Sequence, residues 1–451
     1  MAGRRGFCLV AGNPSASLAD MITHWVRLLT SSSLAAGFML LGAAPRAAAA
    51  DGDWPEFRGR GGQGISAAAG LPLRWSRTDG VAWRTEVAGV GWSSPVIGGG
   101  RVFLTTGVAA EGEPPSLRVL ALDLATGAIL WDTEVFAAAE NGRASMHRKN
   151  SPASPTPVLH EGRLYVHFGH FGTACLDAGG RVIWRNNRLR YEPEHGNGGS
   201  PIVVGDLLVF SADARTEPAL VALNRKSGEL AWRVAREIEV RQKFSFATPL
   251  LAEIGGRPQI ISPASGAVLA HDPADGRELW RVRYGQGYSL VPRPVLAHGL
   301  IFVGTGYNKA DLLAIRADGA TGDLTDTHVV WKMSKGAPLT PSVVVVGDEL
   351  YAVSDMGVAT CVDARTGGVH WQEKLEGGYS ASPLAAGDRI YFQNEQGLGT
   401  VLAAGKAFTK LATNDLGERT LASYAVAGSS LLIRSEKAVY RIGSAPARGG
   451  D

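Results

Sequence analysis

The fold of this chain is decided by residues 121 to 131, which read Ala121-Leu122-Asp123-Leu124-Ala125-Thr126-Gly127-Ala128-Ile129-Leu130-Trp131. The same plan, an acid or amide, then a glycine, then a closing tryptophan, returns along most of the chain. Later copies close at Trp232, Trp280 and Trp371. A period of about 40 to 50 residues that contains only strand and turn signals predicts a repeat architecture.

Each repeat also carries a second block, in which a small residue and a proline precede two short apolar runs. Its copies begin at Ser94-Pro95, Ser200-Pro201, Thr340-Pro341 and Ser382-Pro383. Apolar runs separated by Gly-Asp or Gly-Arg pairs are hairpin signals, so each unit should hold four strands. In the first block, Asp123 can bond its own turn, Gly127 can adopt positive φ, and Trp131 can pack on a neighbouring sheet. Because one unit cannot bury both of its faces alone, the units should stack into an all-β propeller.

The number of blades follows from the closing tryptophans. They are Trp83, Trp131, Trp184, Trp232, Trp280, Trp331 and Trp371, and Leu411 takes the place in a further copy. Three strand-like runs follow Leu411, near residues 423–426, 431–434 and 438–442. Pairing them with the strand around Trp83 completes an eighth blade and removes the exposed sheet edges. We predict eight blades, with seven as the alternative if the unit ending at Trp331 merges with a neighbour.

The two ends of the chain are expected to lie outside the propeller of residues 81–443. Residues 1–50 resemble a secretory signal peptide, since the apolar stretch 34–41 precedes small residues suited to cleavage after Ala50. That stretch is shorter than the roughly 20 residues that span a membrane. Met21 is a plausible true start. Residues 51–80 should form a lead-in that packs on the propeller, and residues 444–451 a disordered tail; the mature protein would be periplasmic or secreted, and we expect a monomer.

The charge balance argues against a nucleic-acid partner, and the positions of the cysteines argue against a disulfide. Without residues 1–50, basic and acidic side chains are equal in number. A general nucleic-acid surface needs a basic excess, so no nucleic-acid partner is expected. Cys175 and Cys361 stand where other repeats have alanine, in blades on opposite sides of the ring. A disulfide needs Cα atoms within about 7 Å, so we predict two buried free thiols.

The motif Ala-x-Asp-x-x-Thr-Gly-x-x-x-Trp resembles that of the pyrroloquinoline quinone (PQQ) repeat propellers, from Trp83 to Ile442. The segment Asp53-Trp54-Pro55-Glu56-Phe57-Arg58-Gly59 resembles the lead-in of secreted bacterial members, which are similar to the propeller lipoprotein of outer-membrane β-barrel assembly. The resemblance implies one of two kinds of protein. One is a non-catalytic scaffold, and the other is a PQQ-dependent alcohol dehydrogenase, which holds its quinone with two adjacent cysteines and a Ca²⁺ ion. This sequence has no adjacent cysteines and no Cys-x-x-Cys-His haem segment.

A ligand site, if present, is expected where the chain leads into the first strand of each blade, at the mouth of the central channel. These segments are aromatic, basic and amide-rich, and they contain almost no acids. A concave site with a few converging polar groups is where ligands usually bind, and this composition suits a small anionic ligand. The candidate ligand-binding residues are Trp92, Lys149, Asn150, His195, Asn197, Lys243, Tyr288, Arg293, Lys335 and Tyr379.

Several other polar residues are interpreted as structural. His167 and His170 lie three apart at a strand end, where alternation separates their side chains, so no metal site is expected. Asp355 and Glu395 should cap turns. The lead-in residues Trp54, Phe57 and Arg58 should pack over one blade, with a contact to a partner as the alternative. The connection from 135 to 150 is the best candidate for a lid or docking loop.

We therefore predict a non-catalytic periplasmic propeller that binds an envelope protein or a small ligand. No catalytic residue can be assigned, and no cofactor is expected. A quinoprotein dehydrogenase that uses PQQ with Ca²⁺ is one alternative, and a carbohydrate-binding propeller is another.

Overall fold

The computed structural model describes residues 53–109, 115–137, 146–308 and 310–443. All of them belong to one compact unit, Ala50–Asp451. The expected signal peptide and tail lie outside the described residues. No helix within the described ranges is long and apolar enough to cross a membrane. Within the same ranges, the short helices are the 3-10 turns η1 (Arg60–Gly62) and η3 (Gly169–Phe171).

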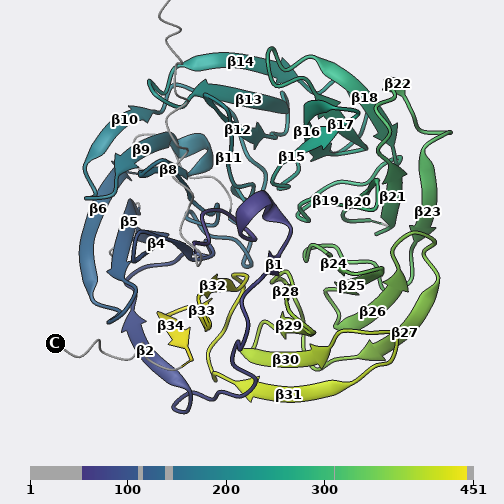
Figure 1. The fold of residues 1–451 in the computed structure, drawn as a ribbon. Coiled ribbons are helices and arrows are strands. Elements are labelled where there is room, and N and C mark those ends of the chain that lie inside the picture. The colour runs from purple at the N-terminus through teal and green to yellow at the C-terminus, as the bar shows by residue number, and fades with distance from the viewer. Residues whose placement is uncertain (1–52, 110–114, 138–145, 309, 444–451) are drawn as a thin grey trace, which may run out of the picture. The chain divides into compact units, whose positions relative to one another are not determined.

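The described chain forms eight antiparallel sheets, each a blade with four main strands, arranged in a ring (Figure 1). Blade 1 contains β3 (Val96–Gly98), β4 (Arg101–Val108), β5 (Ser116–Asp123) and β6 (Ile129–Ala137), and blade 2 contains β7 (Val158–His160), β8 (Arg163–His167), β9 (Thr173–Asp177) and β10 (Val182–Asn186). Blade 3 contains β11 (Ile202–Val204), β12 (Leu207–Ala212), β13 (Ala219–Asn224) and β14 (Leu230–Ala235), and blade 4 contains β15 (Leu250–Ile254), β16 (Arg257–Ala264), β17 (Ala267–His271) and β18 (Glu278–Arg283).

The second half of the ring repeats this plan. Blade 5 contains β19 (Val295–Ala297), β20 (Leu300–Gly304), β21 (Leu312–Arg316) and β23 (Val329–Met333), and blade 6 contains β24 (Val344–Val346), β25 (Glu349–Val353), β26 (Val358–Asp363) and β27 (Val369–Lys374). Blade 7 contains β28 (Leu384–Ala386), β29 (Arg389–Gln393), β30 (Leu398–Ala403) and β31 (Lys410–Asp415). Blade 8 contains β32 (Ala425–Ala427), β33 (Ser430–Arg434), β34 (Ala438–Ile442) and β2 (Val81–Glu86).

The ring closes through blade 8, as predicted. Strand β2 pairs antiparallel with β34, and Trp83 lies opposite Arg441. This pairing joins the two ends of the propeller and confirms eight blades. Cys175 in β9 and Cys361 in β26 are buried free thiols, which confirms the prediction that the two cysteines form no disulfide.

Most closing tryptophans dock on the blade that follows. The indole N–H donates over 2.9 to 3.2 Å to a backbone carbonyl of the next blade, in the pairs Trp83–Leu124, Trp131–Ala178, Trp184–Arg225, Trp232–Pro273, Trp331–Ala364 and Trp371–Gly405. The glycine of the motif makes this contact possible. A Cβ atom at Gly127 would lie 2.6 Å from the ring of Trp83. Gly127 also has φ +76°, a conformation that favours glycine.

Trp280 departs from this pattern. Its indole N–H donates to Oε1 of Gln259 at 2.8 Å, within its own blade. A short strand from the next blade, β22 (Gly322–Asp323), pairs in parallel with β18 beside it. This insertion explains why the unit that ends at Trp331 looks degenerate in the sequence.

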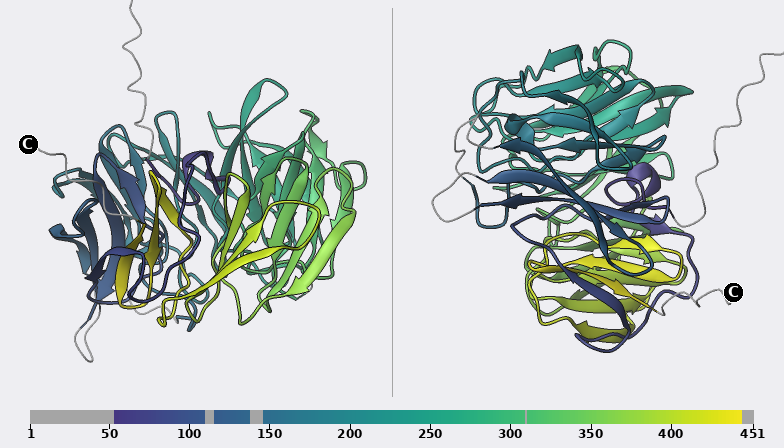
Figure 2. Two further views of the ribbon diagram at one scale, coloured as in Figure 1. Left: turned by 60° about the horizontal axis from the view of Figure 1, so that its bottom comes forward. Right: turned by 90° about the vertical axis from the view of Figure 1, so that its left-hand side faces the viewer.

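The described part of the lead-in runs inside the ring and does not close over one blade (Figure 2). It forms hydrogen bonds with inner segments of five blades, at Ile97, Leu159, Leu296, Val343 and Ala385 of blades 1, 2, 5, 6 and 7. Strand β1 (Ile65–Ser66) then pairs in parallel with β28. The lead-in leaves beside blade 7, where Trp75 stacks on Tyr391 with ring centroids 6.5 Å apart. The channel is therefore filled by the chain's own N-terminal segment.

Candidate functional site

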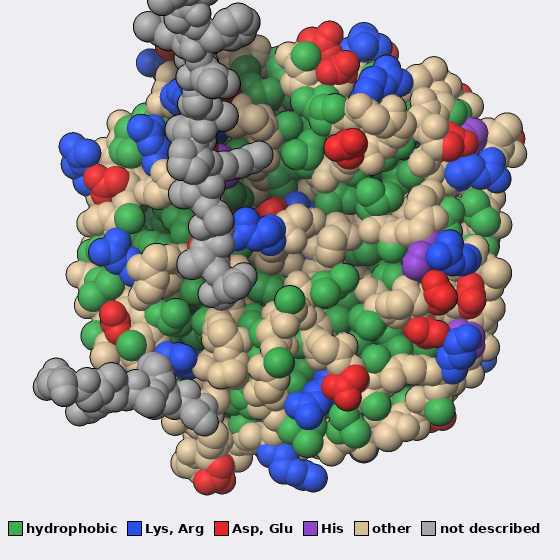
Figure 3. All heavy atoms as spheres, viewed as in Figure 1, with side chains coloured by type: hydrophobic (Ala, Val, Ile, Leu, Met, Phe, Trp, Pro, Cys, Tyr) green, Lys and Arg blue, Asp and Glu red, His purple; other side chains and the backbone are tan. Residues whose placement is uncertain are grey.

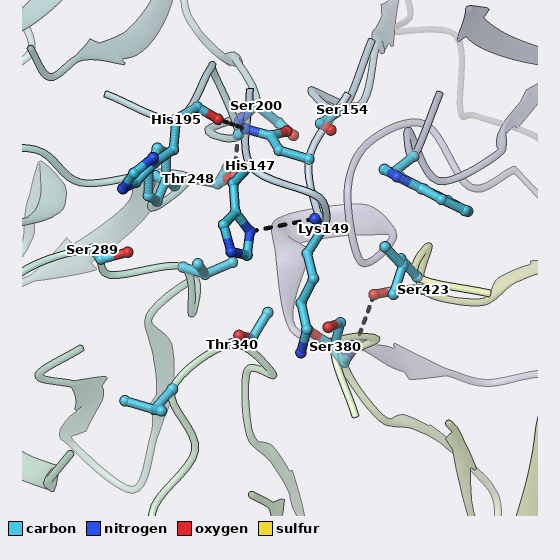
Figure 4. Close-up of a pocket in the computed structure, with 18 of the residues that line it drawn as sticks. His147, Lys149, Ser154, His195, Ser200, Thr248, Ser289, Thr340, Ser380 and Ser423 are labelled. Atoms are coloured by element: carbon cyan, nitrogen blue, oxygen red, sulfur yellow. Dashed lines mark hydrogen bonds between the residues drawn. The ribbon is translucent and has the colours of Figure 1, made fainter. Parts of the chain in front are cut away.

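A cavity of about 560 Å³ opens on the face of the ring where the chain leads into the first strand of each blade, here called the mouth face (Figure 4). Blades follow one another clockwise in Figure 1, whereas the labelled residues of the same blades run anticlockwise in Figure 4, so the two figures view opposite faces. Phe57 of the lead-in is among the lining residues. The cavity is thus a blind hollow, because the lead-in fills the channel behind it.

A ring of hydroxyl groups surrounds the channel. It consists of the residue two places before the first strand of seven blades, namely Ser94, Thr156, Ser200, Thr248, Ser342, Ser382 and Ser423. Each hydroxyl oxygen accepts the backbone N–H of the corresponding residue in the preceding blade, over 2.9 to 3.2 Å. We call this set the hydroxyl ring. All its members except Ser342 line the cavity.

Arg293 takes the place of the hydroxyl residue in blade 5. Its side chain is 2% exposed and donates to Oε2 of Glu56 at 2.9 Å, to Phe57 O at 2.7 Å and to Pro249 O at 3.1 Å. Arg58 lies nearby and donates to the carbonyls of Gln63 and Val343. Burial, together with the charge of Arg293, lowers the pKa of Arg58 to about 9. Both arginines therefore hold the lead-in in the channel.

One side of the cavity is aromatic. His147, His195, Phe244, Tyr288 and Tyr307 line it in this order, with successive ring centroids 5.4 to 5.7 Å apart, and Phe246 lies beside Phe244 at 5.8 Å. We call these six residues the aromatic arc. Partial burial lowers the pKa of His147, and the neighbouring charges of His195, Arg148 and Lys149 lower it further. His195 and Ser289, which also lines the cavity, have φ of +62° and +58°. Such backbone strain concentrates at binding sites.

Three charged side chains of the mouth face, Lys149, Glu395 and Asp355, already have partners. Lys149 Nζ lies 2.6 Å from Oε1 of Glu395, which also accepts from Ser380 at 2.6 Å. Asp355 accepts hydrogen bonds from the backbone N–H groups of Leu339 and Thr340 and from the Thr340 hydroxyl. Asp355 thus caps a loop, whereas Glu395 binds both the nearby Ser380 and Lys149, which comes from the other side of the mouth.

The structure brings together half of the residues that the sequence nominated for ligand binding. Trp92, Lys149, Asn150, His195 and Tyr288 line the cavity. The others lie elsewhere: Asn197 bonds His170, Lys243 and Lys335 do not line it, Arg293 anchors the lead-in, and Tyr379 is fully buried between blades 6 and 7. Ligand binding by any of them remains a prediction.

The sequence interpretation missed the hydroxyl ring, Phe57 and Tyr307. The hydroxyl before proline was visible as a repeat, but it was interpreted only as a strand signal. In blade 6 that interpretation was also two residues out of register, because Ser342 and not Thr340 occupies the ring position.

His167 and His170 each have their own partner. Nδ1 of His167 lies 2.8 Å from the hydroxyl of Thr173, and Nδ1 of His170 lies 3.0 Å from Nδ2 of Asn197. Within the described ranges, no group of three or more His, Cys, Asp or Glu side chains could hold a metal ion. The acids nearest the cavity, Asp355 and Glu395, are occupied by the contacts above, so this donor set does not fit a quinone-bound Ca²⁺, and we derive no step through one.

The eight-bladed ring and its tryptophan contacts define a PQQ-repeat β-propeller. Residues 115–327 and 320–436 match the family model described as outer membrane protein assembly factor BamB, and because this match covers most of the chain, the chain belongs to that family. A BamB of Shewanella oneidensis is 23% identical over 234 residues, which are 49% of this chain and 56% of the relative. The chain thus matches just over half of the relative's length.

Solved structures show the same fold. BamB from Moraxella catarrhalis superposes with a TM-score of 0.55 and 14% identity, covering 82% of this chain and 100% of that one. The computationally designed protein Ika8 gives a TM-score of 0.56 and 11% identity, covering 80% and 99%. At these identities the likeness concerns the fold alone.

Proposed function

We propose that this protein is a non-catalytic interaction module of the bacterial cell envelope, located in the periplasm, and that a partner protein docks on its mouth face. Membership of a family described by an outer-membrane assembly factor supports the class of function. The proposal commits to a protein partner that presents apolar side chains.

The observation that carries the docking surface is a second hollow beside the cavity. It has a volume of about 300 Å³ and shares Tyr307, Leu339 and Asp355 with the cavity. Tyr307 is 56% exposed and Met356, which also lines the hollow, is 74% exposed. Exposed apolar groups beside a pocket are typical of protein docking sites, and methionine adapts its shape to a partner.

The opposite face offers little to attract a charged partner. The lead-in occupies its centre (Figure 1), and acidic and basic side chains alternate around its rim (Figure 3). A mixed rim without a dominant sign provides little steering for a charged partner.

Site-specific cross-linking in cells that produce the protein tests this proposal. A photoreactive phenylalanine analogue at Tyr307 should cross-link one envelope protein, identified by mass spectrometry. The matched control carries the same group at Ile183, which is 38% exposed on the outer strand β10. The Tyr307 adduct should disappear in a Met356→Asp background. Equal cross-linking from both positions, or an adduct that survives Met356→Asp, would reject the mouth face as the docking surface. Fractionation should find a mature chain beginning near Asp51 in the periplasm.

A further inference from the structure

The hydroxyl ring has hydrogen-bonding capacity that the protein does not use. A serine or threonine hydroxyl can donate one hydrogen bond and accept two. Each ring hydroxyl accepts one backbone N–H, and none donates to an acceptor within the described residues. The six that line the cavity are 2 to 6% exposed, so they lie at its floor. The cavity therefore presents a set of converging O–H donors to whatever enters it.

The walls of the cavity define the rest of the ligand. The aromatic arc offers apolar surface on one side, which suits a ligand with a C–H face. The sequence composition predicted an anion, yet Lys149, the one lysine or arginine among the described residues that line the cavity, is paired with Glu395. Arg293 and Arg419, which lie close by, are paired with Glu56 and Glu436. An anion in the cavity would lose its hydration without gaining an unpaired lysine or arginine among the residues that line it. A neutral ligand rich in oxygen acceptors fits this site better.

From these features we infer that the cavity binds a neutral carbohydrate. A sugar ring would stack its C–H face on the aromatic arc, and its hydroxyl and ring oxygens would accept from the six ring hydroxyls that line the cavity. The volume of about 560 Å³ lies within the roughly 300 to 1,000 Å³ of small-molecule sites and has room for a short oligosaccharide. The inference does not depend on the docking of a protein partner, because the hydroxyl ring and the arc residues Phe244 and Tyr288 lie outside the second hollow, which shares only Tyr307 with the arc.

The test is a glycan array that displays neutral and acidic oligosaccharides, followed by calorimetric titration of the full mature protein with the best neutral ligand. Two ring members provide matched variants. Ser382 lines the cavity and accepts the N–H of Ser342, whereas Ser342 accepts the N–H of Arg293 but lies outside the cavity. Ser382→Ala should weaken binding about three- to tenfold, the value of one neutral hydrogen bond. Ser342→Ala should leave the affinity within about twofold.

A third variant keeps the inference testable if the ring substitutions disturb folding. Tyr288→Ala removes a half-buried member of the aromatic arc and should weaken glycan binding at least tenfold, whereas Met356→Asp should leave it unchanged. Three results would overturn the inference: binding of no neutral glycan on the array, preferential binding of acidic glycans, or equal losses in Ser382→Ala and Ser342→Ala. Loss of protein cross-linking with intact glycan binding would reject the docking surface alone.

Discussion

Lys149 and Glu395 form an ion pair across the mouth of the channel, with Nζ and Oε1 2.6 Å apart. Lys149 belongs to the connection between blades 1 and 2, and Glu395 lies in the hairpin between β29 and β30 of blade 7. Arg419 adds a second tie by donating to the carbonyl of Arg148 at 3.2 Å. On the other side, Asn150 donates to the carbonyl of His195 at 2.9 Å. Residues 147–150 thus lie as a strap over one edge of the cavity.

Lys149→Met should loosen this strap with little effect on global stability. The side chains of the pair are 31% and 14% exposed, so we expect the free energy of unfolding to change by no more than about 1 kcal/mol. Amide hydrogen exchange of Asn150 should become faster, because the strap loses one of its ties. The control is Lys226→Met, which breaks an exposed pair with Asp206 far from the strap. Unchanged exchange at Asn150 would mean that the ion pair does not hold the strap.

Arg293→Ala should destabilise the protein by about 3 to 5 kcal/mol. The substitution leaves the Glu56 carboxylate and the backbone carbonyls of Phe57 and Pro249 without their donor. Urea unfolding measures the loss, and proteolysis of the lead-in should accelerate. Arg277→Ala is the control, because that arginine is 63% exposed and pairs with Asp272 at the surface. Equal stability of the two variants would show that the lead-in is not anchored by Arg293. An Arg293 variant is also a poor probe of ligand binding, because it disturbs the floor of the cavity.

Gly180→Ala should cost at least about 3 kcal/mol, because two penalties combine. Gly180 has φ +88°, and a Cβ there would lie 2.6 Å from the ring of Trp131. Gly162→Ala separates the two effects, since Gly162 has φ +71° but a Cβ added there would meet no atom within 4 Å. We expect this control to cost only about 1 kcal/mol. Thermal and urea unfolding of both variants give the comparison, and equal losses would mean that the tryptophan contact does not require glycine.

The protein should lose stability as the pH falls from about 6.5 towards 4. Burial lowers the pKa of His167 to about 3 and those of His170 and His271 to about 4. In this window the unfolded chain takes up protons that the folded chain does not, so the free energy of unfolding falls by up to about 1.4 kcal/mol per histidine and pH unit.

Urea unfolding at a series of pH values measures this slope. His271→Gln removes one of the three groups, and it should reduce the slope by about one proton. His271 is 1% exposed and Nδ1 lies 2.9 Å from Gly276 O, so a glutamine amide can replace that contact. A slope that His271→Gln leaves unaltered would contradict the assignment.

PQQ should not bind at the mouth of the channel. We expect no saturable quenching of tryptophan fluorescence, with Trp92 as the reporter at the cavity, up to about 100 μM quinone with or without Ca²⁺ (roughly −5.5 kcal/mol). Tighter, Ca²⁺-dependent binding that is lost in Lys149→Ala would revive the dehydrogenase alternative.

The fold was predictable because each copy of the repeat contains the residues that specify its own turns and strands. The Asp and Gly of the motif specify a turn, and alternation specifies the strands, so every blade could be located from short stretches. Closure by the strand of Trp83 was also predictable, since an open ring would leave two sheet edges unpaired. The exception was the unit that ends at Trp331, where β22 crosses to blade 4.

The site was only partly predictable, for a geometric reason. The sequence indicated which segments reach the mouth, but not which side chain of each segment points inward. Tyr379 was nominated with Tyr288, yet the former packs in the core and the latter lines the cavity. Lys149 and Glu395 are 246 positions apart, and no local pattern relates them.

The sequence by itself determined the strand plan, the blade count and the closure of the ring, because these depend on contacts within a repeat or between adjacent repeats. Only the tertiary structure decided that the lead-in fills the channel, that Arg293 serves as its anchor, and that hydroxyls from seven of the eight blades meet around the channel. These features depend on where distant segments meet around a common axis. Their energies come from burial and hydrogen bonds between residues that have no periodic relation in the chain.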